Sequence, residues 1–166
     1  MSRELNPTIE QALQSFLAAK QRMTNCLANV PDEHINWSPS PTSRTPVEQV
    51  AHSAGAVKMI HDTLMGDMFA VPTSAEADIG FRSWEARFRS RKDVTRLLER
   101  YSEDYVNWLQ TLEANDLTKM IEMPFGMGQV PLSLAITFPA AHMNEHSAQI
   151  DYIQTIHGDR DWHTGF

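Results

Sequence analysis

"AAHMNEHSAQID", residues 140–151, places two histidines four positions apart in a segment whose apolar residues recur at helical spacing. Residues four apart on an α-helix project to one side, one turn apart. Gln149, seven residues after His142, falls on the same side. The stretch therefore predicts a helix with a polar stripe of His142, His146 and Gln149 on an otherwise apolar surface.

Two neutral histidines on one helix face can bind a single metal ion, which would also satisfy imidazoles that are costly to bury unpaired. The Gln149 amide could reach a ligand or hold a histidine in orientation. A third protein ligand is needed, and His52 is the best candidate. It lies on a predicted helix over residues 46–66, with Gly55, Ala56 and Met59 on its own side leaving room for an imidazole.

The other four histidines fit less well. His61 lies nine residues after His52, so it points about 180° away on the same helix, and we expect it at the surface or at an interface. His34 lies in a proline-rich connection, His157 in the last turn of the final helix and His163 in a polar tail. We expect none of them to join the site.

Two other metal-site motifs fit the sequence less well. A di-iron bundle uses Glu-x-x-His pairs, and the chain contains none. "HMNEH", residues 142–146, does match the inverted zinc-protease pattern H-x-x-E-H, in which Glu145 would be the general base. That pattern needs a glutamate ligand further along, and no glutamate follows His146. Glu145 is then either a base near the metal face or a solvated helix residue.

Helical signals continue over most of the chain. Asn6 and Pro7 begin a helix over residues 7–29, and Thr45, Pro46 and Glu48 form a capping box for the second helix. Further helices are predicted from a cap at Ser90 to about residue 112 and over residues 132–157, with a kink at Pro139. Residues 67–90 give a mixed signal with a short helical fragment around "SWEARF" (residues 83–88), and residues 118–133 suggest a small hairpin around two glycines.

These elements predict an all-α protein, a four-helix bundle with a small hairpin before the last helix. At 166 residues, the chain fits one domain over residues 1–166. The second helix has two apolar stripes, which a bundle interior plus a subunit interface would explain. We therefore expect a homodimer.

Composition excludes several classes of partner. The formal net charge is −7, from 14 basic and 21 acidic residues, which argues against nucleic-acid binding.

Cys26 is the only cysteine, so no internal disulfide can form, and its helical context predicts a half-buried core residue. No apolar run approaches the ~20 residues of a membrane span, and no signal-peptide core is present. We expect a soluble, cytoplasmic protein.

The chain resembles the DinB-like superfamily of four-helix bundles, which includes the YfiT-like proteins. The resemblance rests on the entry "WSPSPTSRTPVEQVAHSAG" (residues 37–55) and on the H-x3-H-x2-Q pattern of the final helix, and it covers roughly residues 5–157. It implies a metal triad of His52, His142 and His146. It also implies either a metal-dependent hydrolase or a transferase or isomerase that uses a low-molecular-weight thiol.

The expected function is therefore that of a metal-dependent enzyme acting on a small molecule. Three neutral imidazoles leave coordination positions open to water or substrate, and they suit Zn, Ni or Fe without selecting among them. Glu145 is the candidate base and Gln149 the candidate cofactor-binding residue. The alternative is a non-catalytic or stress-related bundle whose ion is structural.

Overall fold

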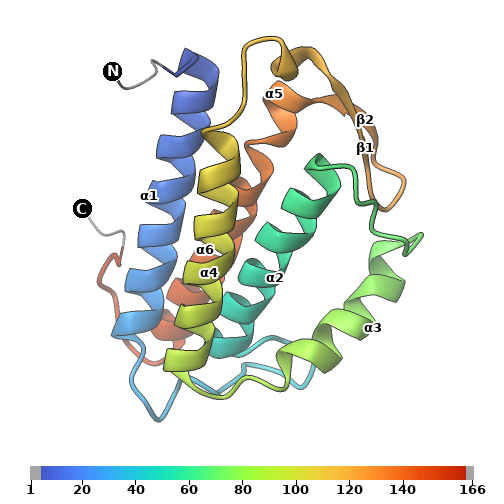
Figure 1. Cartoon of the computed structure of the whole chain (residues 1–166). Helices are drawn as coiled ribbons and strands as arrows, with labels where there is room; N and C mark the ends of the chain where they lie inside the picture. Colours follow the sequence, from blue (N-terminus) through green and yellow to red (C-terminus); the bar gives the residue numbers. More distant parts are fainter. Residues whose placement is uncertain (1–4, 164–166) are drawn as a thin grey trace.

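Four long helices lie side by side in the computed structural model, which describes residues 5–163 (Figure 1). They are α1 (Pro7–Asn29), α2 (Pro46–Leu64), α4 (Arg91–Leu109) and α6 (Phe138–Ile156). Between them lie α3 (Ser74–Glu85), a short 3-10 helix (Asp116–Thr118), the strands β1 (Met120–Met123) and β2 (Gly128–Pro131), and α5 (Leu132–Ala135). The predicted all-α bundle is confirmed.

The order of the helices around the bundle differs from their order in the chain. α1 packs mainly against α6 and α4, and α2 packs mainly against α4 and α6, so α1 and α2 lie on a diagonal. In Figure 1, α1 and α6 run downward whereas α2 and α4 run upward. The proline-rich connection over residues 30–45 therefore crosses the lower end of the bundle. This crossing makes α2 the antiparallel neighbour of α6, the helix with the paired histidines.

The predicted helix starts agree with the structure. The Asn6 side chain accepts a hydrogen bond from Thr8 N at 2.9 Å. At α2, Thr45 Oγ1 accepts from Glu48 N at 3.2 Å and Glu48 Oε2 accepts from Thr45 N at 2.9 Å. Both bonds of the capping box are thus present, which fixes the first turn of the helix that bears His52.

The final helical segment is divided into α5 and α6, so the prediction of a single helix over residues 132–157 is wrong. A proline ring clashes with the carbonyl four residues earlier, which for Pro139 is that of Ala135, the last residue of α5. Pro139 therefore lies in the first turn of α6 instead of kinking a continuous helix. The buried Tyr105 hydroxyl donates to the Ile136 carbonyl at 2.7 Å, which satisfies an acceptor exposed by the break.

Residues 74–85 form a full helix, α3, where the sequence predicts only a fragment over residues 83–88. Thr73 caps it by accepting from Glu76 N at 3.3 Å. Only Ala77 and Glu85 of α3 are buried, which explains the weak apolar periodicity. Its Trp84 packs on α2, where a Cβ added to Gly55 would lie 3.0 Å from the indole. The space beside His52 that we assigned to an imidazole is thus filled partly by Trp84.

Both apolar stripes of α2 are covered within the chain. His61, expected at the surface or at an interface, is instead 8% exposed and packs against the rings of Tyr105 and Trp108 from α4. α2 contacts α4, α6, α3 and β1. The intramolecular contacts therefore account for the stripes that suggested a homodimer, and dimerisation stays a prediction without that argument.

The predicted hairpin is confirmed. β1 and β2 pair antiparallel, with Met123 opposite Gly128, and residues 124–127 form the connecting loop. The hairpin lies beside the upper ends of α2 and α3 (Figure 1). In the described part of the chain, none of the helices combines the length and the apolar character that crossing a membrane requires.

Candidate metal centre

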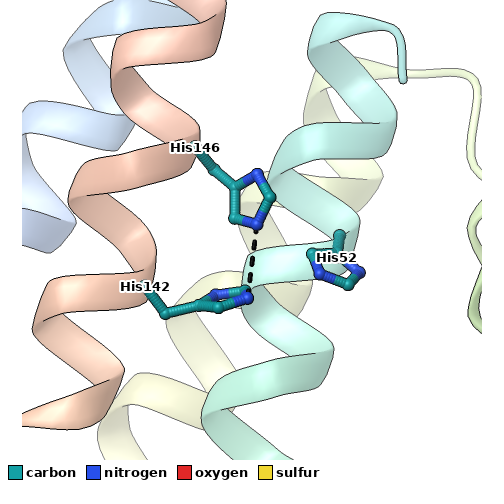
Figure 2. Close-up of side chains that lie close together, drawn as sticks. All are labelled: His52, His142 and His146. Atoms are coloured by element: carbon teal, nitrogen blue, oxygen red, sulfur yellow. Dashed lines mark hydrogen bonds between the residues drawn. The ribbon is translucent and has the colours of Figure 1, made fainter. Parts of the chain in front are cut away.

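Three histidines meet between α2 and α6. His52 lies on α2, and His142 and His146 lie on successive turns of α6 (Figure 2). One ligand nitrogen from each ring lies within 4.8 Å of the others. The ring centroid of His52 is 5.1 Å from that of His142 and 4.8 Å from that of His146. The structure thus brings together the three residues selected from the sequence.

The spacing of the two histidines on α6 fits a bound ion. Their Nε2 atoms lie 3.3 Å apart. Two nitrogens that each lie about 2.0–2.1 Å from a tetrahedral ion are separated by roughly 3.3–3.4 Å. The pair can therefore accept an ion with little movement of either ring.

His146 is held by two glutamine side chains on the far side of its ring. Its Nδ1–H donates to Gln49 Oε1 at 2.6 Å and to Gln149 Oε1 at 2.8 Å. A protonated Nδ1 leaves a lone pair on Nε2, which faces His142. Of the two roles considered for Gln149, the structure favours orientation of a histidine over contact with a ligand.

His52 is held in the same manner by a buried carboxylate. Its Nδ1 lies 2.5 Å from Glu85 Oε1, and Glu85 is 1% exposed. Arg44 donates to both oxygens of Glu85, at 2.6 Å from Nε and 3.1 Å from Nη2, and also to Asp78 at 2.7 Å. A carboxylate that accepts the second N–H of a ligating histidine is a common support of metal sites.

The pKa of Glu85 lies below its ordinary value. Burial alone would raise it, but the hydrogen bonds and charges of His52 and Arg44 outweigh that effect. Glu85 is therefore ionised and can accept the N–H of His52. Neither Glu85 nor Arg44 was expected from the sequence, because they lie 33 and 8 positions from His52 in segments without a clear helical signal.

Burial keeps the two histidines of α6 neutral. It lowers the pKa of His142 to about 3, helped by the charges of His146, His52 and Arg44. It lowers the pKa of His146 to about 4, helped by His52 and opposed by the Gln149 hydrogen bond. Neutral imidazoles are the form that binds metal ions. In the described structure, Nδ1 of His142 is buried without a hydrogen-bond partner.

A cavity of about 780 Å³ reaches two of the three histidines. His52, His142 and Glu145 line it, together with residues of α2, α3, α6 and the hairpin. Glu145 is exposed, and within residues 5–163 its carboxylate has no hydrogen-bond or ion-pair partner. The arrangement gives a candidate ion, a free carboxylate and room for a small molecule in one place.

Other candidate residues lie elsewhere. His34 and His157 stack with centroids 3.6 Å apart, and Trp37 packs edge-on against His157. The Cys26 thiol is fully buried and lies 3.1 Å from Asp151 Oδ1. Burial and the Asp151 carboxylate raise its pKa to about 12, which removes it as a nucleophile at neutral pH.

The family model of the DinB superfamily matches residues 7–150, which include all three histidines. The chain belongs to the DinB superfamily. A search among curated proteins gives no significant match. The family model thus supports the expected DinB-like fold.

Several solved structures share this fold. YfiT from Bacillus subtilis, described as "a probable metal-dependent hydrolase with an unusual four-helix bundle topology", is 14% identical with a TM-score of 0.72, covering 94% of this chain and 91% of YfiT. The sibling lethal factor precursor DfsB is 18% identical with a TM-score of 0.70 (95% and 100% covered). The colibactin self-resistance protein ClbS, solved with double-stranded DNA, is 11% identical with a TM-score of 0.67 (88% and 94%). At these identities the likeness concerns the fold.

Proposed function

We propose that this DinB superfamily protein binds a divalent metal ion through His52, His142 and His146 and acts as a metal-dependent enzyme on a small molecule. The convergence of the three imidazoles is the observation that carries the proposal. Two of the rings present Nε2 to the cluster because Glu85 and the glutamines occupy Nδ1. Three imidazoles suit Zn, Ni or Fe, and the donor set does not select among them.

The bound ion would supply a Lewis acid that lowers the pKa of a water or thiol. The residues around it have separate roles. Glu85, itself held by Arg44, fixes the ring of His52, and Gln149 with Gln49 fixes that of His146. Glu145 borders the cavity with a free carboxylate, so it can accept a proton from a substrate or from water.

Two features favour an enzyme over a structural ion. Structural zinc sites are closed by four protein ligands, whereas within the described residues the cluster contains three histidines and no fourth ligand. The cavity also reaches two of these histidines. Hydrolysis is supported by the description of YfiT, and thiol transfer by the affinity of such ions for sulfur.

Cobalt substitution of untagged protein tests the proposal. The absorption spectrum of bound cobalt reports its ligands, so it should shift when a low-molecular-weight thiol is added if thiol enters an open position. A shift with substrate analogues but not with thiol would favour hydrolysis. A spectrum unchanged by every small ligand, together with a large loss of melting temperature on metal removal, would identify a structural ion and refute the enzyme.

A further inference from the structure

A row of aromatic rings lines the cavity from the histidine cluster to the tip of the hairpin. The ring of His52 meets that of Phe81 on α3 edge-on, with centroids 5.7 Å apart. Phe81 stacks on Phe69 at 5.7 Å, and Phe69 meets Phe125 edge-on at 5.8 Å. These three phenylalanines, here called the aromatic row, all line the cavity. They come from α3, the α2–α3 connection and the hairpin loop, so three segments of the chain contribute to one surface.

Phe125 is held in an unfavourable backbone conformation. Its φ is 62°, and it is the one described non-glycine residue with a positive φ. A side chain with a Cβ pays a conformational cost in this region, whereas glycine, which follows at position 126, does not. Strain of this kind is concentrated at functional sites. The ring that this conformation presents lies on the cavity wall.

The charges around the cavity disfavour an anionic ligand. Its two basic residues are paired within the protein, Arg44 with Glu85 and Asp78, and Lys58 with Asp62 at 2.6 Å. Among the described charged side chains of the cavity wall, the one without an ion-pair partner is the carboxylate of Glu145. Apart from the ion itself, the described wall therefore offers no cation to an acidic substituent. Much of the remaining wall is apolar, including methionines that can adapt to different shapes.

We infer that the cavity binds a neutral aromatic compound, or the neutral aromatic part of a larger one, against the aromatic row, with its reacting group beside the histidines. Phe69, Phe81 and Phe125 are then specificity-determining residues. Offset and edge-on ring contacts favour flat aromatic ligands, and a cavity of this size suits a drug-sized molecule. The inference rests on the proposed function in taking the bound compound to be a substrate of the metal site.

Fluorescence titration of the full chain with N-phenyl-1-naphthylamine tests the inference, because this neutral probe brightens when it leaves water. Its sulfonated analogue, anilinonaphthalene sulfonate, has the same rings and a negative charge. We expect saturable binding of the neutral probe and binding of the analogue weaker by about tenfold or more. Equal affinity for the two probes, or no saturable binding of the neutral one, would overturn the inference.

Two variants locate the binding site. Phe125→Gly removes a ring while glycine tolerates the positive φ, and Phe69→Leu keeps an apolar side chain without a ring. Each variant should weaken the affinity for the neutral probe by about fivefold to tenfold, because apolar area and ring contacts are lost. Tyr152→Ala is the matched control, since Tyr152 is 66% exposed and outside the cavity. Affinity unchanged in both phenylalanine variants, or reduced as much in the control, would refute the assignment.

The same titration on protein stripped of metal by chelation separates this inference from the proposed function. The aromatic row does not depend on an ion, so the affinity for the neutral probe should persist within about twofold. If the protein binds no metal but still binds the probe through the row, the proposed enzyme fails and the aromatic site stands. If metal binds and the probe does not, the reverse holds.

Discussion

At the scale of single residues, Glu85 explains how a short sequence motif becomes an ordered site. The histidines alone could rotate, but Glu85 fixes His52, and Gln49 fixes His146 across 97 positions of sequence. The three histidines could be predicted as ligands because two of them share one helix face. Of their supports, Gln149 could be predicted because it shares that face. Glu85 and Gln49 could not, because no local spacing connects either residue to the histidine that it holds.

Glu85→Gln should weaken metal binding by about tenfold to a hundredfold, the usual effect of losing a carboxylate behind a ligating histidine. The amide keeps the shape but not the charge that holds His52 and Arg44. Competition with a chromophoric chelator measures the affinity. Glu103→Gln, an exposed change on α4, is the control. An unaltered metal affinity in Glu85→Gln would remove this carboxylate from the site.

At the scale of elements, local signals predicted four helices and one hairpin, while contacts between elements decided the rest. Asn6, Thr45 and Ser90 mark their helix starts because capping depends on neighbours two or three residues away. Most of α3 escaped prediction because its main contacts, Trp84 on Gly55 and the Glu85–Arg44 pair, are made with other segments. Those contacts join segments that are far apart in the sequence.

Two glycine substitutions test how α3 docks. Gly55→Ala would place a Cβ 3.0 Å from the Trp84 indole, so Trp84 must shift. We expect a loss of up to about 2 kcal/mol in the free energy of unfolding, because the cost of overpacking, about 1–3 kcal/mol, is partly offset by the better helix propensity of alanine. Gly80→Ala, inside α3 with nothing within 4 Å, should be neutral or should stabilise by up to about 1 kcal/mol. Urea denaturation measures the free energy of unfolding of both variants. Equal effects of the two substitutions would contradict the packing of Trp84 on Gly55.

At the scale of the whole molecule, the bundle confines neutral histidines in its interior, and this makes stability depend on pH. In the metal-free chain, the pKa values of His142 and His146, about 3 and about 4, lie below the ordinary 6.5. The unfolded chain then binds more protons than the folded one between these values. Stability should be complete above about pH 6.5 and should fall as the pH drops toward 4.

Urea midpoints of chelated protein between pH 7.5 and 4.5 measure this dependence. The change of the midpoint with pH should be smaller in a His142→Ala/His146→Ala double variant, which lacks both imidazoles. Metal added at neutral pH should raise the midpoint, because the histidines are brought together only in the folded chain, which therefore binds the ion more tightly. A wild-type midpoint that rises on acidification, or a change with pH that is the same in the variant, would contradict the buried neutral state.

The metal content of untagged protein tests the central claim most directly. Elemental analysis should find about one divalent ion per chain in the wild type. It should find almost none in the His142→Ala/His146→Ala double variant, which keeps a single histidine of the cluster. The control is His34→Ala/His157→Ala, which removes two histidines that stack away from the cluster and should retain the ion. Full metal content in the His142→Ala/His146→Ala protein would contradict the account.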